Sequence, residues 1–134
     1  MSFALDPRLA ADTFEVADLA LSRLLLMNDS RYPWLILAPR RPALREIVDL
    51  DAPARALLME EIAAASQFVR ALPGVEKINV GALGNVVSQL HVHVLGRAVG
   101  DPAWPGPVWG AGAAVRYTPE SAAALIDKAR AVFG

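Results

Sequence analysis

The chain has 134 residues, a net charge of −1, and 54% hydrophobic residues. This length predicts one domain over residues 1–134, because a chain of this size buries about two thirds of its unfolded surface. The balanced charge argues against nucleic-acid binding, and the absence of cysteine excludes disulfides, thiolate zinc sites and thiol nucleophiles. Neither residues 1–7 nor any later segment is typical of a signal or a membrane span, so we expect a cytoplasmic protein without membrane contact.

The first half of the chain predicts three strands and a helix. After a turn at Asp6-Pro7, alternation over residues 13–16 predicts one strand, and the apolar run 21–27 predicts a second. Residues 34–38 lie between a turn and two prolines, and they predict a third strand in a hairpin with the second. A long helix is then expected from a cap at Asp51, with apolar residues at three- and four-residue spacing until Pro73-Gly74.

The second half predicts two more strands, a long loop and a terminal helix. The strands are expected over residues 75–82 and 88–95, joined by a short connection at 83–85. Glycines and prolines make residues 100–112 irregular, and a helix is expected to start at Thr118. We therefore predict an α+β fold: a mainly antiparallel sheet of about five strands, with one long helix and a C-terminal helix.

The chemistry is concentrated in the last predicted strand. Its two histidines, His91 and His93, are the only ones in the chain, and with Gln89 they share one face of a strand. Side chains two apart on a strand are separated by roughly 7 Å, which suits two rings that flank one phosphate group. A neutral imidazole is a competent nucleophile near pH 7, and a protonated neighbour can stabilise phosphoryl oxygens.

Two other interpretations of these histidines are open. One is an exposed strand face that carries polar residues without a function. The other is a metal site, but it needs a third ligand, and the chain has no other histidine or cysteine to provide one. A distant carboxylate is the remaining candidate, and we expect no metal and no cofactor.

Residues 89–97 (Gln-Leu-His-Val-His-Val-Leu-Gly-Arg) resemble the characteristic strand of the histidine-triad (HIT) family, in which three histidines alternate with apolar residues. Asn79 and Gly84-Asn85 resemble the family's Asn and Gly-Gln positions before that strand. Asn28-Asp29 resembles its ribose-contacting turn. These matches occur in the family's order, and the chain is similar to bacterial dinucleoside polyphosphate hydrolases.

The resemblance implies a residue-by-residue assignment of roles. His91 would be the nucleophile that takes a nucleotidyl group at the α-phosphate, and His93 would contact that phosphate and assist proton transfer. Asn79, Gly84 and Asn85 would line the phosphate site. The remaining pair, Asn28 and Asp29, would bind the ribose. The family further implies a homodimer whose sheets join across the interface.

Three positions depart from the family pattern. Gln89 replaces the first histidine, and glutamine can orient a neighbour but cannot ionise. Val86 and Trp34 stand where many members carry a hydroxyl residue and a further histidine, so both are expected to remove polar groups.

The arginines Arg40, Arg41 and Arg97 could contact the outer phosphates of a nucleotide, although arginines on protein surfaces are mostly solvated.

Together these features predict a metal-independent nucleotide hydrolase or nucleotidyl transferase. Its expected ligand is a purine nucleotide or a dinucleoside polyphosphate-like molecule, cleaved through a covalent intermediate on His91. The alternative is a nucleotide-binding or regulatory module that lost useful turnover together with the first histidine.

Overall fold

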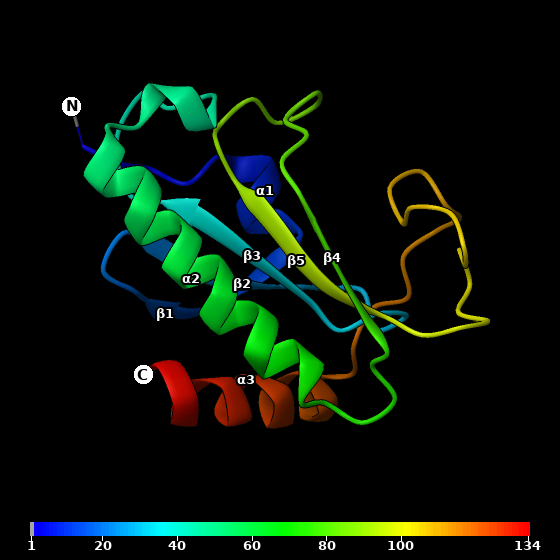
Figure 1. Ribbon diagram of the computed structural model, residues 1–134. Helices are drawn as coiled ribbons and strands as arrows, with labels where there is room; N and C mark the ends of the chain where they lie inside the picture. The colour runs from blue at the N-terminus through cyan, green and yellow to red at the C-terminus, as the bar shows by residue number, and fades with distance from the viewer. Residues whose placement is uncertain (1) are drawn as a thin grey trace.

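The computed structural model describes residues 2–134, and Met1 lies outside the described residues. Over this range the strands form a five-stranded antiparallel sheet in the order β1-β2-β3-β5-β4, so the histidine strand β5 lies inside it (Figure 1). The strands are β1 Thr13–Asp18, β2 Ser22–Met27, β3 Trp34–Pro39, β4 Lys77–Gly81 and β5 Val92–Arg97. This confirms the predicted α+β fold.

The β2–β3 hairpin is the centre of the core, and it confirms the predicted pairing of these two strands. Leu24 pairs with Leu37 and Leu26 with Leu35, and every residue of β3 is buried. β3 is apolar throughout because layers of side chains cover both faces of the sheet. One layer contains Leu24, Leu37 and Val92, and the other contains Leu25, Ile36 and Leu95.

Helix α2 (Ala52–Arg70) crosses one face of the sheet (Figure 1). It begins where predicted, because the Asp51 carboxylate accepts a hydrogen bond from the Ala54 N–H at 2.9 Å. Glu61 is 6% exposed and accepts from the backbone N–H groups of Leu21 and Ser22 at 2.8 and 3.1 Å. This carboxylate fastens the middle of α2 to the start of β2. A short 3₁₀ helix, η1 (Ile47–Asp49), precedes α2.

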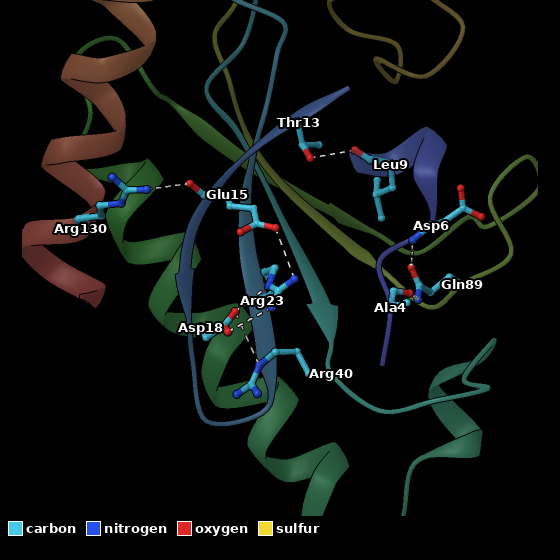
Figure 2. A network of polar contacts seen from close by, with 10 residues as sticks. All are labelled: Ala4, Asp6, Leu9, Thr13, Glu15, Asp18, Arg23, Arg40, Gln89 and Arg130. Carbon is cyan, nitrogen blue, oxygen red and sulfur yellow. Dashed lines mark hydrogen bonds and ion pairs between the residues drawn. The ribbon is translucent and has the colours of Figure 1, made fainter. Parts of the chain in front are cut away.

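Helix α3 (Pro119–Phe133) packs beside α2 and β1. Its start confirms the predicted cap, since the Thr118 hydroxyl accepts from the Ser121 N–H. Near its end, the Arg130 guanidinium donates to the backbone carbonyls of Val16 and Glu15 at 2.8 and 3.1 Å, and Figure 2 shows this arginine reaching toward β1. Two side-chain bonds thus attach the C-terminal helix to the edge strand.

Helix α1 (Pro7–Ala11) lies behind the sheet in Figure 1, on the face opposite α2. The turn expected at Asp6-Pro7 is therefore wrong in extent, because these residues begin a helix. The Asp6 carboxylate accepts from the Arg8 N–H at 2.9 Å, and Leu9 is buried in the second layer. Val108 and Trp109, from the irregular segment 98–117, also pack on this face. The segment agrees with the loop predicted at 100–112. Within residues 2–134, no helix is long and apolar enough to span a bilayer.

Candidate active site

The histidine strand starts later than the sequence predicted. β5 begins at Val92 rather than at residue 88, so His93 lies in the strand and His91 lies immediately before it. The expected short hairpin to β4 is also wrong, because residues 82–91 form a longer connection. Its backbone bonds elsewhere: the Leu90 N–H donates to the Leu44 carbonyl at 3.0 Å, away from β4.

The His91 ring is held by its own chain. Its Nδ1 lies 2.7 Å from the backbone carbonyl oxygen of Gln89, and the ring is 7% exposed. Because a carbonyl can only accept, Nδ1 carries the proton, and in the neutral ring Nε2 keeps its lone pair. This tautomer is the one that a nucleophilic imidazole needs at Nε2.

The His93 ring is fixed in the complementary tautomer. The indole Nε1–H of Trp34 donates to His93 Nδ1 at 3.0 Å, so the neutral ring carries its proton on Nε2. Burial, and then the neighbouring His91, lowers the pKa of His93 to about 4. His93 is thus a neutral donor at pH 7, and the expected imidazolium role does not fit the protein in this state.

The two rings are closer than ideal strand geometry predicts. Their centroids are 4.9 Å apart, with an angle of 68° between the ring planes, instead of the roughly 7 Å expected. His91 precedes the regular strand and its ring bonds to the Gln89 carbonyl, so ideal strand spacing does not apply to this pair. One phosphate group can therefore contact both rings more closely than the sequence suggested.

Gln89 does not join the two histidines through its side chain. Its carboxamide oxygen accepts from the Asp6 N–H at 2.9 Å, and its Nε2 donates to the Ala4 carbonyl at 2.7 Å. Figure 2 shows this contact between Gln89 and the N-terminal segment. The Gln89 side chain thus anchors the segment that leads into α1, while its backbone carbonyl orients His91.

A cavity of about 360 Å³ lies against the histidines. His91 and His93 line it together with Gly84 and Asn85, two of the residues expected at a phosphate site. Gly84 has φ +70°, a conformation that favours glycine. The other residues that line the cavity come from α1, β2 and the loops: Arg8, Leu9, Asp12, Met27, Leu83, Val86, Val87 and Trp109.

A second cavity of about 280 Å³ lies beside Asn28 and Asp29. It shares Asp12, Met27 and Trp109 with the histidine cavity, so the two adjoin. The sequence placed these motifs about sixty residues apart, and the fold brings their cavities together.

The Asn28-Asp29 turn is tightly bonded within the protein. Asn28 Oδ1 accepts from the Tyr117 N–H at 2.9 Å, and Asp29 forms a 2.8 Å ion pair with Arg31. Asp29 also accepts from the Val115 N–H at 3.3 Å. Burial alone would raise the pKa of Asp29, but these hydrogen bonds outweigh it and lower the pKa below its usual value.

Asn79 and Arg97 form a separate cluster. Asn79 Oδ1 accepts from Arg97 at 2.9 Å, and Asn79 lines neither of the two cavities. Arg97 is 2% exposed and pairs with Asp101 at 2.7 Å, so it is not the solvated arginine that the sequence suggested. The phosphate-site role of Asn79 stays a prediction, and it requires this side chain to act through Arg97 or to rearrange.

Comparison with known proteins identifies the family of the chain. The HIT domain model matches residues 8–100. The chain belongs to the HIT family. No curated protein matches the sequence, and across residues 2–134 no group of three or more metal-ligating side chains is present.

Solved HIT structures match nearly the whole chain. They include histidine-triad proteins from Bradyrhizobium japonicum (41% identity, TM-score 0.96, all of both chains covered), and from Marinobacter aquaeolei (45%, 0.95, 99% of this chain and 97% of that one). A third, from Sinorhizobium meliloti, has 43% identity and a TM-score of 0.94 over 97% and 96% of the two chains. A HIT-like protein from Bartonella henselae, described as involved in cell-cycle regulation, is 15% identical at a TM-score of 0.66 over 90% of this chain and 86% of that one, and it shares the fold.

Sequence reasoning missed two tryptophan contacts in this HIT site. Trp34 was expected to remove a polar group, but its indole N–H replaces one by bonding to His93. Trp109 packs edge-on against His93, with the ring centroids 5.3 Å apart. The replacement of a family histidine by another N–H donor was the available signal for Trp34. The sequence left Trp109 open between a cap over the site and a dimer interface, and it gave no signal for the contact with His93.

Proposed function

We propose that this HIT protein is a nucleotide hydrolase that forms a covalent nucleotidyl intermediate on His91. HIT proteins are generally nucleotide-binding hydrolases or transferases, and the observation that carries the proposal is the fixed tautomer of His91 beside the cavity. The substrate class is a phosphoanhydride or phosphoramidate of a purine nucleoside, including dinucleoside polyphosphates. The reaction as proposed needs no metal ion.

In the first step, the Nε2 lone pair of His91 attacks the α-phosphorus. A nitrogen–phosphorus bond forms as the bond to the bridging oxygen or nitrogen breaks, and that electron pair leaves with the leaving group. The imidazole becomes positively charged, and the Gln89 carbonyl, 2.7 Å from Nδ1, stabilises this charge. A phosphate leaving group departs as an anion, whereas an amine takes a proton from water.

In the second step, water attacks the same phosphorus and the bond to His91 breaks. The electron pair returns to His91 Nε2, and the proton of the water is released to solvent. His93 supports both steps as a neutral donor, because the Trp34 bond to Nδ1 leaves the proton on Nε2. A neutral donor to a non-bridging oxygen stabilises the developing charge without itself changing protonation state.

The two adjoining cavities support the proposed placement of the nucleotide. The phosphate would lie among His91, Gly84 and Asn85, and the nucleoside would extend toward Asn28 and Asp29. Asp29 Oδ2 accepts two hydrogen bonds, both from Arg31, at 2.8 and 3.3 Å, and a ribose hydroxyl would bind there by replacing the longer one.

The proposal includes a homodimer through β4. This strand pairs with β5 on one side, and within residues 2–134 no strand covers its other edge. An uncovered edge strand is a template for pairing with another chain, and Val80 on it is 48% exposed. Light scattering of the purified protein should give twice the monomer mass, and a monomer across concentrations would contradict this part.

The experiment is a hydrolysis assay in the presence of a chelator. We expect the wild-type protein to cleave a dinucleoside tetraphosphate or adenosine phosphoramidate with EDTA present, and His91→Ala to lose at least about 1,000-fold in kcat. Val132→Ala, on the exposed side of α3, is the control for expression and folding.

A nucleotide-binding module is the rival function, favoured by the use of the Gln89 side chain outside the histidine pair. It predicts that nucleotide binds with similar affinity to the wild type and to His91→Ala, while neither protein shows turnover. That result would contradict the proposed hydrolase and leave a binding role.

A further inference from the structure

Four buried side-chain polar atoms have no hydrogen-bond partner within residues 2–134: Ser22 Oγ, Tyr32 Oη, Arg40 Nε and Trp109 Nε1. Of these, only Trp109 belongs to a residue that lines the histidine cavity. A buried donor without a partner is unfavourable, and native proteins keep such groups mainly where a ligand, water or ion completes them. The position of Trp109 favours a ligand.

Trp109 stands where the two cavities of the site adjoin. It lines both of them, and its ring packs edge-on against His93 and Trp34, with centroid distances of 5.3 and 6.4 Å. The far end of its ring lies against Gly81, where an added Cβ would come within 2.9 Å of the indole. Trp109 is therefore packed against His93, Trp34 and Gly81.

The other two tryptophans, Trp34 and Trp104, show why the missing hydrogen-bond partner of Trp109 Nε1 is informative. The N–H of Trp34 is bonded to His93, which leaves that ring's Nδ1 unable to accept from Trp109 as well. Trp104 lies on the same long loop but is 36% exposed and lines neither cavity. Among the three tryptophans, Trp109 alone combines a position in the site with an indole N–H that has no partner within residues 2–134.

Trp109 lies in the irregular segment 98–117 and is followed by Gly110, which has φ +83°. Because Nε1 is buried in this structure, a bond from it to a ligand in the cavity requires the indole to turn. Such a turn would take place in the loop, since Trp109 belongs to no strand of the sheet.

We propose that Trp109 Nε1–H donates a hydrogen bond to an α-phosphate oxygen of the bound nucleotide, and so positions the phosphate beside His91. The phosphate oxygen is the acceptor because Trp109 contacts His93, whose ring lines the phosphate cavity. Bonds to a charged oxygen are stronger than bonds to a neutral one, so this contact favours a nucleotide over a nucleoside. The inference rests on the proposed nucleotide site but not on turnover.

The test uses the indole N–H signals of the ¹⁵N-labelled protein, which has three tryptophans. Trp34→Phe, Trp104→Phe and Trp109→Phe assign the signals, and AMP and adenosine are then titrated separately. With AMP we expect the Trp109 signal to move downfield and its hydrogen exchange to slow, while the Trp104 signal stays fixed. Adenosine lacks the phosphate, so we expect it to move the Trp109 signal no more than it moves the Trp104 signal.

A binding measurement supplies the second readout. Trp109→Phe should weaken AMP binding about tenfold and adenosine binding less than threefold, whereas Trp104→Phe should change neither by more than twofold. A Trp109 signal that moves equally with adenosine would overturn the phosphate contact, and so would unchanged AMP affinity in Trp109→Phe.

The outcomes separate this inference from the proposed hydrolase. AMP binding with a fixed Trp109 signal overturns the inference alone. A moved signal in a protein without turnover supports the inference and contradicts the hydrolase. If AMP does not bind, both are overturned.

Discussion

The two ends of the candidate site differ in how many of their polar atoms already have hydrogen-bond partners in the protein. At the histidine end, His91 has one nitrogen bonded to the Gln89 carbonyl, and the other has no bonding partner within residues 2–134. At the other end, Asp29 is 2% exposed and accepts from Arg31 and from the Val115 N–H, while Asn28 accepts from the Tyr117 N–H. The histidine end thus keeps a nitrogen free to contact a ligand, whereas the polar atoms of Asn28 and Asp29 already bond to neighbouring loops.

A residue of a binding motif can have a structural role as well as a role in binding. Asp29 and Asn28 bond to the backbone of Val115 and Tyr117, in a segment whose residues Ala114 and Arg116 line the cavity beside them. A ribose would therefore meet a carboxylate already fixed in place by its ion pair. Preorganisation of this kind lowers the ordering cost of binding.

The largest effect on stability is expected from Asp29→Asn. If Asp29 is mainly structural, removing its charge leaves Arg31 unpaired and should cost about 3 kcal/mol in the free energy of unfolding. Asp18→Asn is the matched control, because Asp18 also pairs with an arginine, Arg23 (Figure 2), but its side chain is 48% exposed. Urea unfolding should give a loss of less than about 1 kcal/mol for the control.

Equal losses in those two variants would contradict the structural role of Asp29. In that case the residue would act only as a ligand group, and its substitution would appear in nucleotide affinity without a change in stability.

A smaller effect is expected from Trp34→Phe at the histidine end. The change removes the donor to His93 Nδ1 and leaves a buried acceptor unpaired, which should cost about 1–2 kcal/mol in urea unfolding. Imidazole NMR should show His93 losing its fixed Nε2–H tautomer. Trp104→Phe is the control, since Trp104 lies outside the histidine cavity. An unchanged His93 tautomer in Trp34→Phe would show that the indole bond does not set it.

The smallest predicted effect is the pH dependence of stability due to His93. Its folded pKa of about 4 lies below the ordinary value of 6.5, so folding favours the neutral ring. This stabilisation is present above pH 6.5 and declines as the pH falls toward 4. Unfolding should be about 0.7 kcal/mol less favourable at pH 7 than at pH 6 from this group alone.

His93→Gln should remove that difference between pH 6 and pH 7, as measured by urea unfolding at the two values. A wild-type protein whose His93 titrates near pH 6.5 by NMR would contradict the burial argument, and His93 could then serve as an imidazolium.

Periodicity and capping were sufficient to predict most of the fold. Asp51 marked the start of α2, Thr118 marked that of α3, and the apolar run 21–27 located β2 closely. These signals are local, so they can be found in a short window of sequence. Helix α1 was missed because only five residues form it, and its stability comes from Leu9 packing under the sheet.

The site was predictable in its residue types but not in its contacts. Alternation placed His91 and His93 on one face, but their ring separation depends on where β5 begins, and that is set by the Leu90 bond to Leu44. The Gln89 contacts to Ala4 and Asp6 join residues more than eighty positions apart. Such long-range bonds have no signal in a single sequence.

The central claim is the covalent chemistry of His91, and trapping of the intermediate tests it most directly. The wild-type protein would be mixed with a dinucleoside tetraphosphate, quenched in alkaline denaturant within milliseconds to protect the acid-labile nitrogen–phosphorus bond, and digested for mass spectrometry. We predict a mass increase of one nucleoside monophosphate on the peptide that contains His91, at that residue, and none in His91→Ala. Turnover without any adduct in the wild type, or an adduct on His93, would contradict the account.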